Sequence, residues 1–110
     1  MLTIRPEQLQ ALQSAMIDRF RQRAIRAAAS MAAFPRAEIV SLVDTAMLRA
    51  PEYGIDAEDD VLAYLGLMIR HGADFDRRSP RAAEILAEER WTGTRKIRAL
   101  QAELAGARDV

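Results

Sequence analysis

The chain has 110 residues, sixteen basic and sixteen acidic side chains, and no cysteine. Its length suits a single domain, and the lack of cysteine excludes a disulfide framework, a thiolate zinc site and a cysteine nucleophile. The sequence has neither a signal-like apolar segment near its start nor a run of about 18 apolar residues, so we expect a cytoplasmic protein without a membrane span.

A long first helix is expected from Pro6 to about Met31. Proline is favoured at the first position of a helix, where its missing N–H is not needed. Apolar side chains recur at steps of three and four, as on one face of a helix; they are Leu9, Leu12, Met16, Phe20, Ala24, Ala27 and Met31. At about 1.5 Å per residue the helix would be about 39 Å long, so we expect one end to project or bend.

The Phe34-Pro35 pair predicts a break, because proline disfavours helix at the residue before it. A second helix is expected from Pro35 or Arg36 to Arg49, closed by Pro51. A turn at residues 52–55 follows.

Asp56 is the predicted N-cap of a third helix, since its carboxylate can accept backbone N–H bonds. This helix is apolar on more than one side and is expected to be central. It ends at His71, with Gly72 as the left-handed cap residue. Gly66 lies inside it, and we expect another backbone to approach closely there.

After residues 73–76 we expect a short fourth helix, capped by Ser79 and started by Pro80, with Ile85 and Leu86 buried. A fifth helix is expected from about residue 94 to residue 105, and residues 106–110 are expected to fray. No segment alternates like a strand. The predicted fold is all-α: one domain over residues 1–110, a compact bundle of about five helices with a long first and a short fourth.

The charges are segregated along the chain. Residues 1–50 carry seven basic and four acidic side chains, residues 51–76 carry one basic and seven acidic, and residues 77–110 carry eight basic and five acidic. The acidic middle could pair with the basic flanks or face solvent, and charge runs usually do one of these. It could also steer a basic partner.

We find no residues arranged for catalysis, a metal or a cofactor. His71 is the only histidine, and its position at a helix end suits complementation of the helix dipole. The acids near Asp56 lack the spacing of a calcium loop and fit the first turn of a helix, where the dipole favours negative charge. We therefore expect a protein that is not an enzyme.

Four arginines of the first helix give the strongest indication of nucleic-acid binding: Arg19, Arg21, Arg23 and Arg26. Arg19, Arg23 and Arg26 share one face of the helix and could make three non-specific, salt-sensitive phosphate contacts. The zero net charge argues against this, and a solvated face or internal pairing is the favoured interpretation.

Aromatic side chains beside charged ones are typical of binding hot spots. Tyr53 and Phe75 are expected in loops that flank the third helix. Together with Tyr64 and Asp76 they are the predicted partner-binding residues.

The order of motifs in the middle of the chain resembles a family of small proteins encoded beside PAAR spike-tip proteins and effector-loading adaptors of bacterial type VI secretion systems. The resemblance rests on Tyr53-Gly54-Ile55, Glu58-x-Asp60-Val61, Tyr64-x-x-Leu67-Met68, Gly72-x-x-Phe75-Asp76, Pro80 and Ile85-Leu86. It extends to the opening LTIRPEQLQAL and to Phe34-Pro35, but departs at residues 28–33, where bulkier or more polar residues are expected.

This resemblance implies a cytoplasmic, non-enzymatic co-chaperone that binds an adaptor, an effector or the spike tip before secretion. The family supplies no catalytic residues. One alternative is an immunity protein that blocks a toxin, which the acidic middle would suit if the toxin were basic. Another is nucleic-acid binding through the first helix, and a homo-oligomer is also open.

Overall fold

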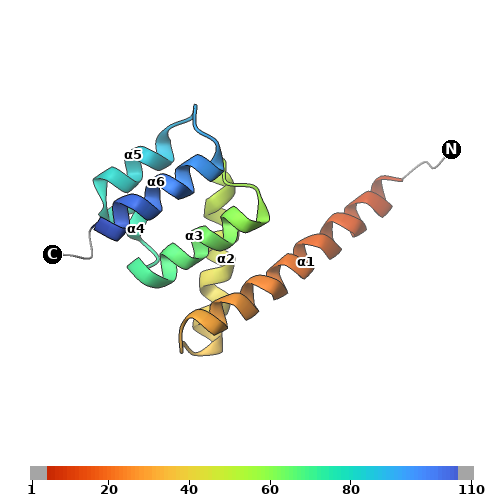
Figure 1. Ribbon diagram of the computed structural model, residues 1–110. Coiled ribbons are helices and arrows are strands. Elements are labelled where there is room, and N and C mark those ends of the chain that lie inside the picture. The colour runs from red at the N-terminus through yellow and green to blue at the C-terminus, as the bar shows by residue number, and fades with distance from the viewer. Residues whose placement is uncertain (1–4, 107–110) are drawn as a thin grey trace.

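The computed structural model describes residues 5–106 and has only helices there (Figure 1). The six helices are α1 (Pro6–Met31), α2 (Arg36–Glu52), α3 (Glu58–His71), α4 (Phe75–Arg78), α5 (Pro80–Ala87) and α6 (Gly93–Gly106). The all-α prediction is confirmed. The expected fraying concerns residues 106–110, of which 107–110 lie outside the described residues.

The bounds of α1 are those predicted, with Pro6 at its first position. Its C-terminal half packs through Ala24, Ile25 and Ala28, whereas residues 5–19 are exposed on every side. We call residues 5–19 the arm. Figure 1 shows it running away from the other helices. The arm contributes to a radius of gyration of 15.7 Å, against about 13 Å for a compact chain of this length.

The apolar stripe of α1 was predicted as one continuous face, and only its part from Phe20 to Ala27 is covered, since Met31 at its end is 50% exposed. Ala24 is buried and Phe20 is half-buried, while Leu9, Leu12 and Met16 are exposed. The arm stays uncovered because it extends past the ends of the helices that pack on the other half (Figure 1).

Helix α2 continues to Glu52, so the prediction that Pro51 closes it at Arg49 was wrong. A proline inside a helix loses one N–H and crowds the preceding turn, but the end of α2 is held by tighter bonds, from the N–H of Tyr53 to the carbonyl of Ala50 and from the N–H of Gly54 to that of Pro51, each 3.0 Å. The chain turns immediately afterwards at Gly54, whose φ of 76° favours glycine. The N–H of Ile55 bonds back to the carbonyl of Ala50 at 2.9 Å, which closes the turn.

Helix α3 lies at the centre, in contact with α1, α2, α4 and α6. Its N-cap is Ala57, and no side chain caps it, so the prediction that Asp56 is the N-cap was wrong by one residue. Its C-terminal end is as predicted: Gly72 has a φ of 100° and its N–H bonds to the carbonyl of Met68.

The C-terminal part contains one more helix than predicted, the single turn α4. The predicted short helix is α5, in which the Ser79 side chain accepts a bond from the N–H of Ala82 at 3.2 Å. Ile85 and Leu86 are buried as expected. Helix α6 runs beside α5, away from the arm (Figure 1).

Candidate partner-binding surface

Three of the four predicted partner-binding residues lie in the core. Tyr64, Phe75 and Asp76 are buried, and Tyr53 is half-buried. Their rings pack together, with centroids 6.2 Å apart for Tyr53 and Tyr64 and 5.5 Å apart for Tyr64 and Phe75. Burial in the single chain argues against direct contact of Tyr64, Phe75 and Asp76 with a partner, and their partner-binding role stays a prediction. Charged neighbours in the sequence did not make these residues exposed, because the charged side chains themselves face solvent or pair with other residues.

A polar cluster fixes the end of α2 to α4. The hydroxyl of Tyr53 donates to Asp76 Oδ2 at 2.6 Å, and Arg49 Nη1 lies 3.7 Å from Asp76 Oδ1. Arg49 also donates to the carbonyl of Ala73 at 2.6 Å. Burial, helped by the bond to Asp76, raises the pKa of Tyr53 to about 12. Burial also raises the pKa of Tyr64, and the charge of Asp76 adds to that effect. The cluster therefore serves folding.

Lys96 is a buried cation that sequence reasoning did not single out. Its ammonium donates to the carbonyls of Tyr53 and Leu86, at 2.7 and 2.8 Å. These bonds tie α6 to the turn after α2 and to the end of α5. Nothing in the local sequence marks this lysine, because its acceptors are main-chain carbonyls of distant residues.

The acidic residues of the middle segment are largely paired inside the fold. Arg23 donates to Glu58 at 3.1 Å and to Asp59 at 3.2 Å, and the hydroxyl of Thr94 donates to Asp60 at 2.6 Å. Glu58 and Asp59 thus pair with a basic flank, as one of the alternatives expected, while their side chains remain exposed. Among residues 5–106 no group of three potential ligands could hold a metal ion.

The arginines of α1 do not form one free basic face. Arg21 makes two bonds to the carboxylate of Asp44, at 2.8 and 3.2 Å, which lower the pKa of Asp44. Arg23 is engaged as described above. Arg19 and Arg26 make no hydrogen bond or ion pair with other described residues. One of the three predicted phosphate contacts, that of Arg23, is thus already occupied, which weakens the nucleic-acid hypothesis.

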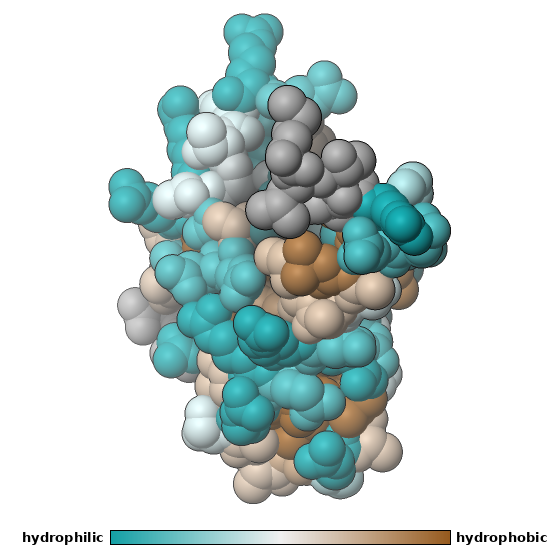
Figure 2. Space-filling view, turned by 90° about the vertical axis from the view of Figure 1, so that its right-hand side faces the viewer, coloured by the Kyte–Doolittle hydropathy of each residue, from teal (hydrophilic) through white to brown (hydrophobic). Residues whose placement is uncertain are grey.

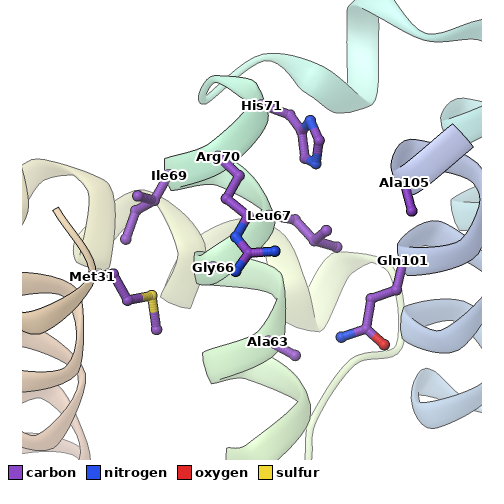
Figure 3. A pocket seen from close by; sticks show the side chains of 9 residues that line it. All are labelled: Met31, Ala63, Gly66, Leu67, Ile69, Arg70, His71, Gln101 and Ala105. Atoms are coloured by element: carbon purple, nitrogen blue, oxygen red, sulfur yellow. The ribbon is translucent and has the colours of Figure 1, made fainter. Parts of the chain in front are cut away.

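A pocket of about 400 Å³ lies between α3 and α6 (Figure 3). Gln101 reaches into it from α6, and Arg70 and His71 lie on the side of α3. Its other lining residues are apolar, and none of them is a serine, a threonine or an acid. The pocket therefore offers no nucleophile with a base. His71 ends α3 as predicted.

The arm carries an uncovered apolar stripe. Leu9, Leu12 and Met16 follow one another at steps of three and four, which places them on one face of the helix. Leu12 is 53% exposed and Met16 is 56% exposed. Figure 2 views the molecule from the side on which α1 projects and shows apolar patches open to solvent between hydrophilic side chains.

An apolar groove of about 640 Å³ lies at the base of the arm, between α1, α2 and the start of α3. Leu48 is its most prominent side chain, because it is 73% exposed in the middle of α2. The apolar lining residues are Ile17, Phe20, Met47, Leu48, Pro51 and Val61, and the polar ones are Arg21, Asp44, Asp56 and Glu58. We call this hollow the groove.

The arm and the groove were both missed as binding surfaces by the sequence interpretation. One signal was available: residues 6–17 contain a single charged side chain, Glu7, although 29% of the whole chain is charged. A fully solvated helix is normally richer in charge. No comparable signal marks Leu48, because its exposure depends on how α1 packs on α2.

Comparisons with protein-family models, with curated proteins and with solved structures return no match for this chain. No helix formed by residues 5–106 is both long enough and apolar enough to cross a bilayer.

Proposed function

We propose that this chain is a non-enzymatic accessory protein of bacterial type VI secretion. In this role it binds a larger protein, which is an effector-loading adaptor, an effector or a PAAR spike-tip protein, through the arm and the groove. The binding would take place in the cytoplasm, before secretion. The class of partner comes from the sequence resemblance, and the binding surface comes from the structure.

The groove is the observation that carries this proposal. Leu48, at 73% exposure, stands at its apolar centre beside Met47 and Val61. The ion pair between Arg21 and Asp44 lies at its polar edge. An apolar centre with a polar rim is the usual anatomy of a protein–protein interface. Large exposed apolar patches on small proteins commonly mark such interfaces.

The residues on which the family resemblance rests stabilise the fold and do not form the proposed binding surface. Tyr64, Phe75 and Asp76 are buried, and Gly54 and Gly72 occupy positions with positive φ. A family that shares them would share this arrangement of α2, α3 and α4. The partner would then be selected by the residues of the arm and the groove.

The test is capture of partners from the native cytosol with tagged chains, followed by mass spectrometry. We expect the unaltered chain to retain an adaptor, an effector or a PAAR protein, and Leu48→Glu to lose it, because a charge would be buried in the interface. Ala102→Glu, an exposed alanine of α6 outside the groove, is the matched control. Absence of all three classes of partner from the unaltered chain, or equal recovery by Leu48→Glu, would contradict the proposal.

A further inference from the structure

We infer that two copies of this chain form a twofold dimer in which the arm of each copy lies in the groove of the other. The arm is a convex apolar feature and the groove is a concave one, and none of residues 5–106 covers either of them. A second copy would cover both features at the same time, since the contact repeats under twofold symmetry.

The arm needs a covering surface from outside its own copy. An isolated helix of about 12–15 residues is marginal in water, and residues 5–19 are exposed on every side. The arm cannot fold back into its own groove, because Ile17 and Phe20 of the same continuous helix line that groove. Between residues 7 and 31 there is no glycine or proline at which α1 could turn.

The shapes of the two features are complementary. The arm is about 22 Å long at about 1.5 Å per residue and presents Leu9, Leu12 and Met16 as a row of knobs. The groove offers the apolar floor made by Met47, Leu48 and other lining residues. A helix that inserts apolar residues spaced by three and four into a hydrophobic groove is a common mode of recognition.

The charged groups of the arm and the groove are compatible with this dimer, and they favour an orientation in which the tip of the arm meets the acidic edge of the groove. Gln8, Gln13 and Ala15 flank the stripe, so an approaching copy meets no like charge there. The edge of the groove carries Asp56, for which the described residues provide no ion-pair partner. The tip of the arm is a helix N-terminus with Arg5 as its N-cap. The partial positive charge of the helix end and the charge of Arg5 suit the acidic edge, and Glu7 in the first turn offsets part of this attraction.

Dimerisation would also regulate the proposed function. A secretion partner that binds the arm and the groove must displace the second copy, so dimerisation and partner binding would compete. This consequence rests on the proposed function, whereas the dimer itself does not.

The experiment is sedimentation velocity of the pure chain and of two variants, from low to high micromolar concentration. We expect the unaltered chain to dimerise. Leu12→Glu in the arm and Leu48→Glu in the groove should each weaken dimerisation about a hundredfold or more, as hot-spot substitutions do. Ala102→Glu, the exposed position of α6 that lies outside both the arm and the groove, introduces the same charge and should leave the dimer intact.

An equimolar mixture of the two variants gives the sharpest result. It contains the intact arm of Leu48→Glu and the intact groove of Leu12→Glu, so we expect it to associate more strongly than either variant alone. Leu12 and Leu48 are exposed in the single chain, and unchanged denaturant midpoints at dilution would show that both variants fold.

Each contrary result overturns the inference. A chain that stays monomeric at all concentrations has no such dimer. A Leu48→Glu variant that still dimerises indicates pairing between arms instead. Two monomeric variants whose mixture does not associate exclude the arm-in-groove contact. An unaltered chain that stays monomeric but captures a secretion partner would leave the proposed function standing, and an unaltered chain that dimerises but captures no such partner would leave the dimer standing.

Discussion

The arm and the helices packed around α3 are built from similar apolar residues but place them in opposite surroundings. Leu65 in α3 is 1% exposed, whereas Leu12 in the arm is 53% exposed. Both lie on faces with helical spacing. Apolar periodicity therefore indicates that a face can be covered, but it does not say whether the same chain or another molecule covers it.

The largest difference is expected when the same truncation is made in both regions. Leu65→Ala should lower the free energy of unfolding by about 2–5 kcal/mol, because it leaves a cavity in a packed core. Leu12→Ala should change it by no more than about 0.5 kcal/mol. Urea unfolding followed by circular dichroism, at concentrations where the chain is monomeric, measures both. Equal losses would show that the arm is part of the core.

The polar cluster gives a second way to test the packed region. Asp76→Ala removes the partner of Tyr53 and leaves Arg49 without its buried carboxylate, and we expect a loss of about 3 kcal/mol. Tyr53→Phe removes only one hydrogen bond and should cost about 1 kcal/mol. The same unfolding measurement applies. An Asp76→Ala variant whose free energy of unfolding is unchanged would show that the cluster does not hold α2 to α4.

Two glycines should respond in opposite directions to the same substitution. A Cβ on Gly93 would lie 2.9 Å from the carbonyl oxygen of Gly54, so Gly93→Ala should cost about 1–3 kcal/mol. A Cβ on Gly66 would meet only the side chain of Met31, at an ordinary 3.8 Å. Gly66→Ala should therefore stabilise the helix by about 0.5–1 kcal/mol.

Thermal melting of the two glycine variants would check these signs. A destabilised Gly66→Ala would support the sequence-based expectation that another backbone approaches there, which the 3.8 Å side-chain contact contradicts.

The smallest effect is expected at the half-buried ion pair between Arg21 and Asp44, near the base of the arm. The pKa of Asp44 is lower in the folded chain than its ordinary 3.8. The pair therefore adds stability above that pH, and the contribution is lost as the pH falls through the lowered pKa. Asp44→Asn should lower the midpoint slightly at pH 7, and the two chains should converge in acid. If the two midpoints differ by the same amount at every pH, the loss of stability in Asp44→Asn is due to packing and not to the charge of Asp44.

Much of the fold could be predicted because local rules decide it. Pro6 begins α1, Gly72 ends α3, and Ser79 with Pro80 begins α5, each through bonds made within a few residues. The errors also have local causes. Pro51 is tolerated inside a last turn, and the N-cap of α3 falls one residue after Asp56.

The binding surface could not be predicted in the same way. Tyr53 and Asp76 are 23 residues apart in sequence and meet only in the folded chain. Leu48 lies on the side of α2 opposite the buried Ile39, Val43 and Ala46, and it is exposed because none of the described helices covers that side. Exposure of this kind depends on tertiary packing, which hydrophobic spacing does not encode.

Hydrogen exchange along α1 and α3 tests most directly the claim that another molecule covers the arm. We would compare the unaltered chain with Leu12→Glu, both at high micromolar concentration, by mass spectrometry of their peptides. The account predicts protected arm amides in the unaltered chain and at least about tenfold faster exchange in the variant, with α3 unchanged. Arm amides that exchange equally fast in both chains would contradict it.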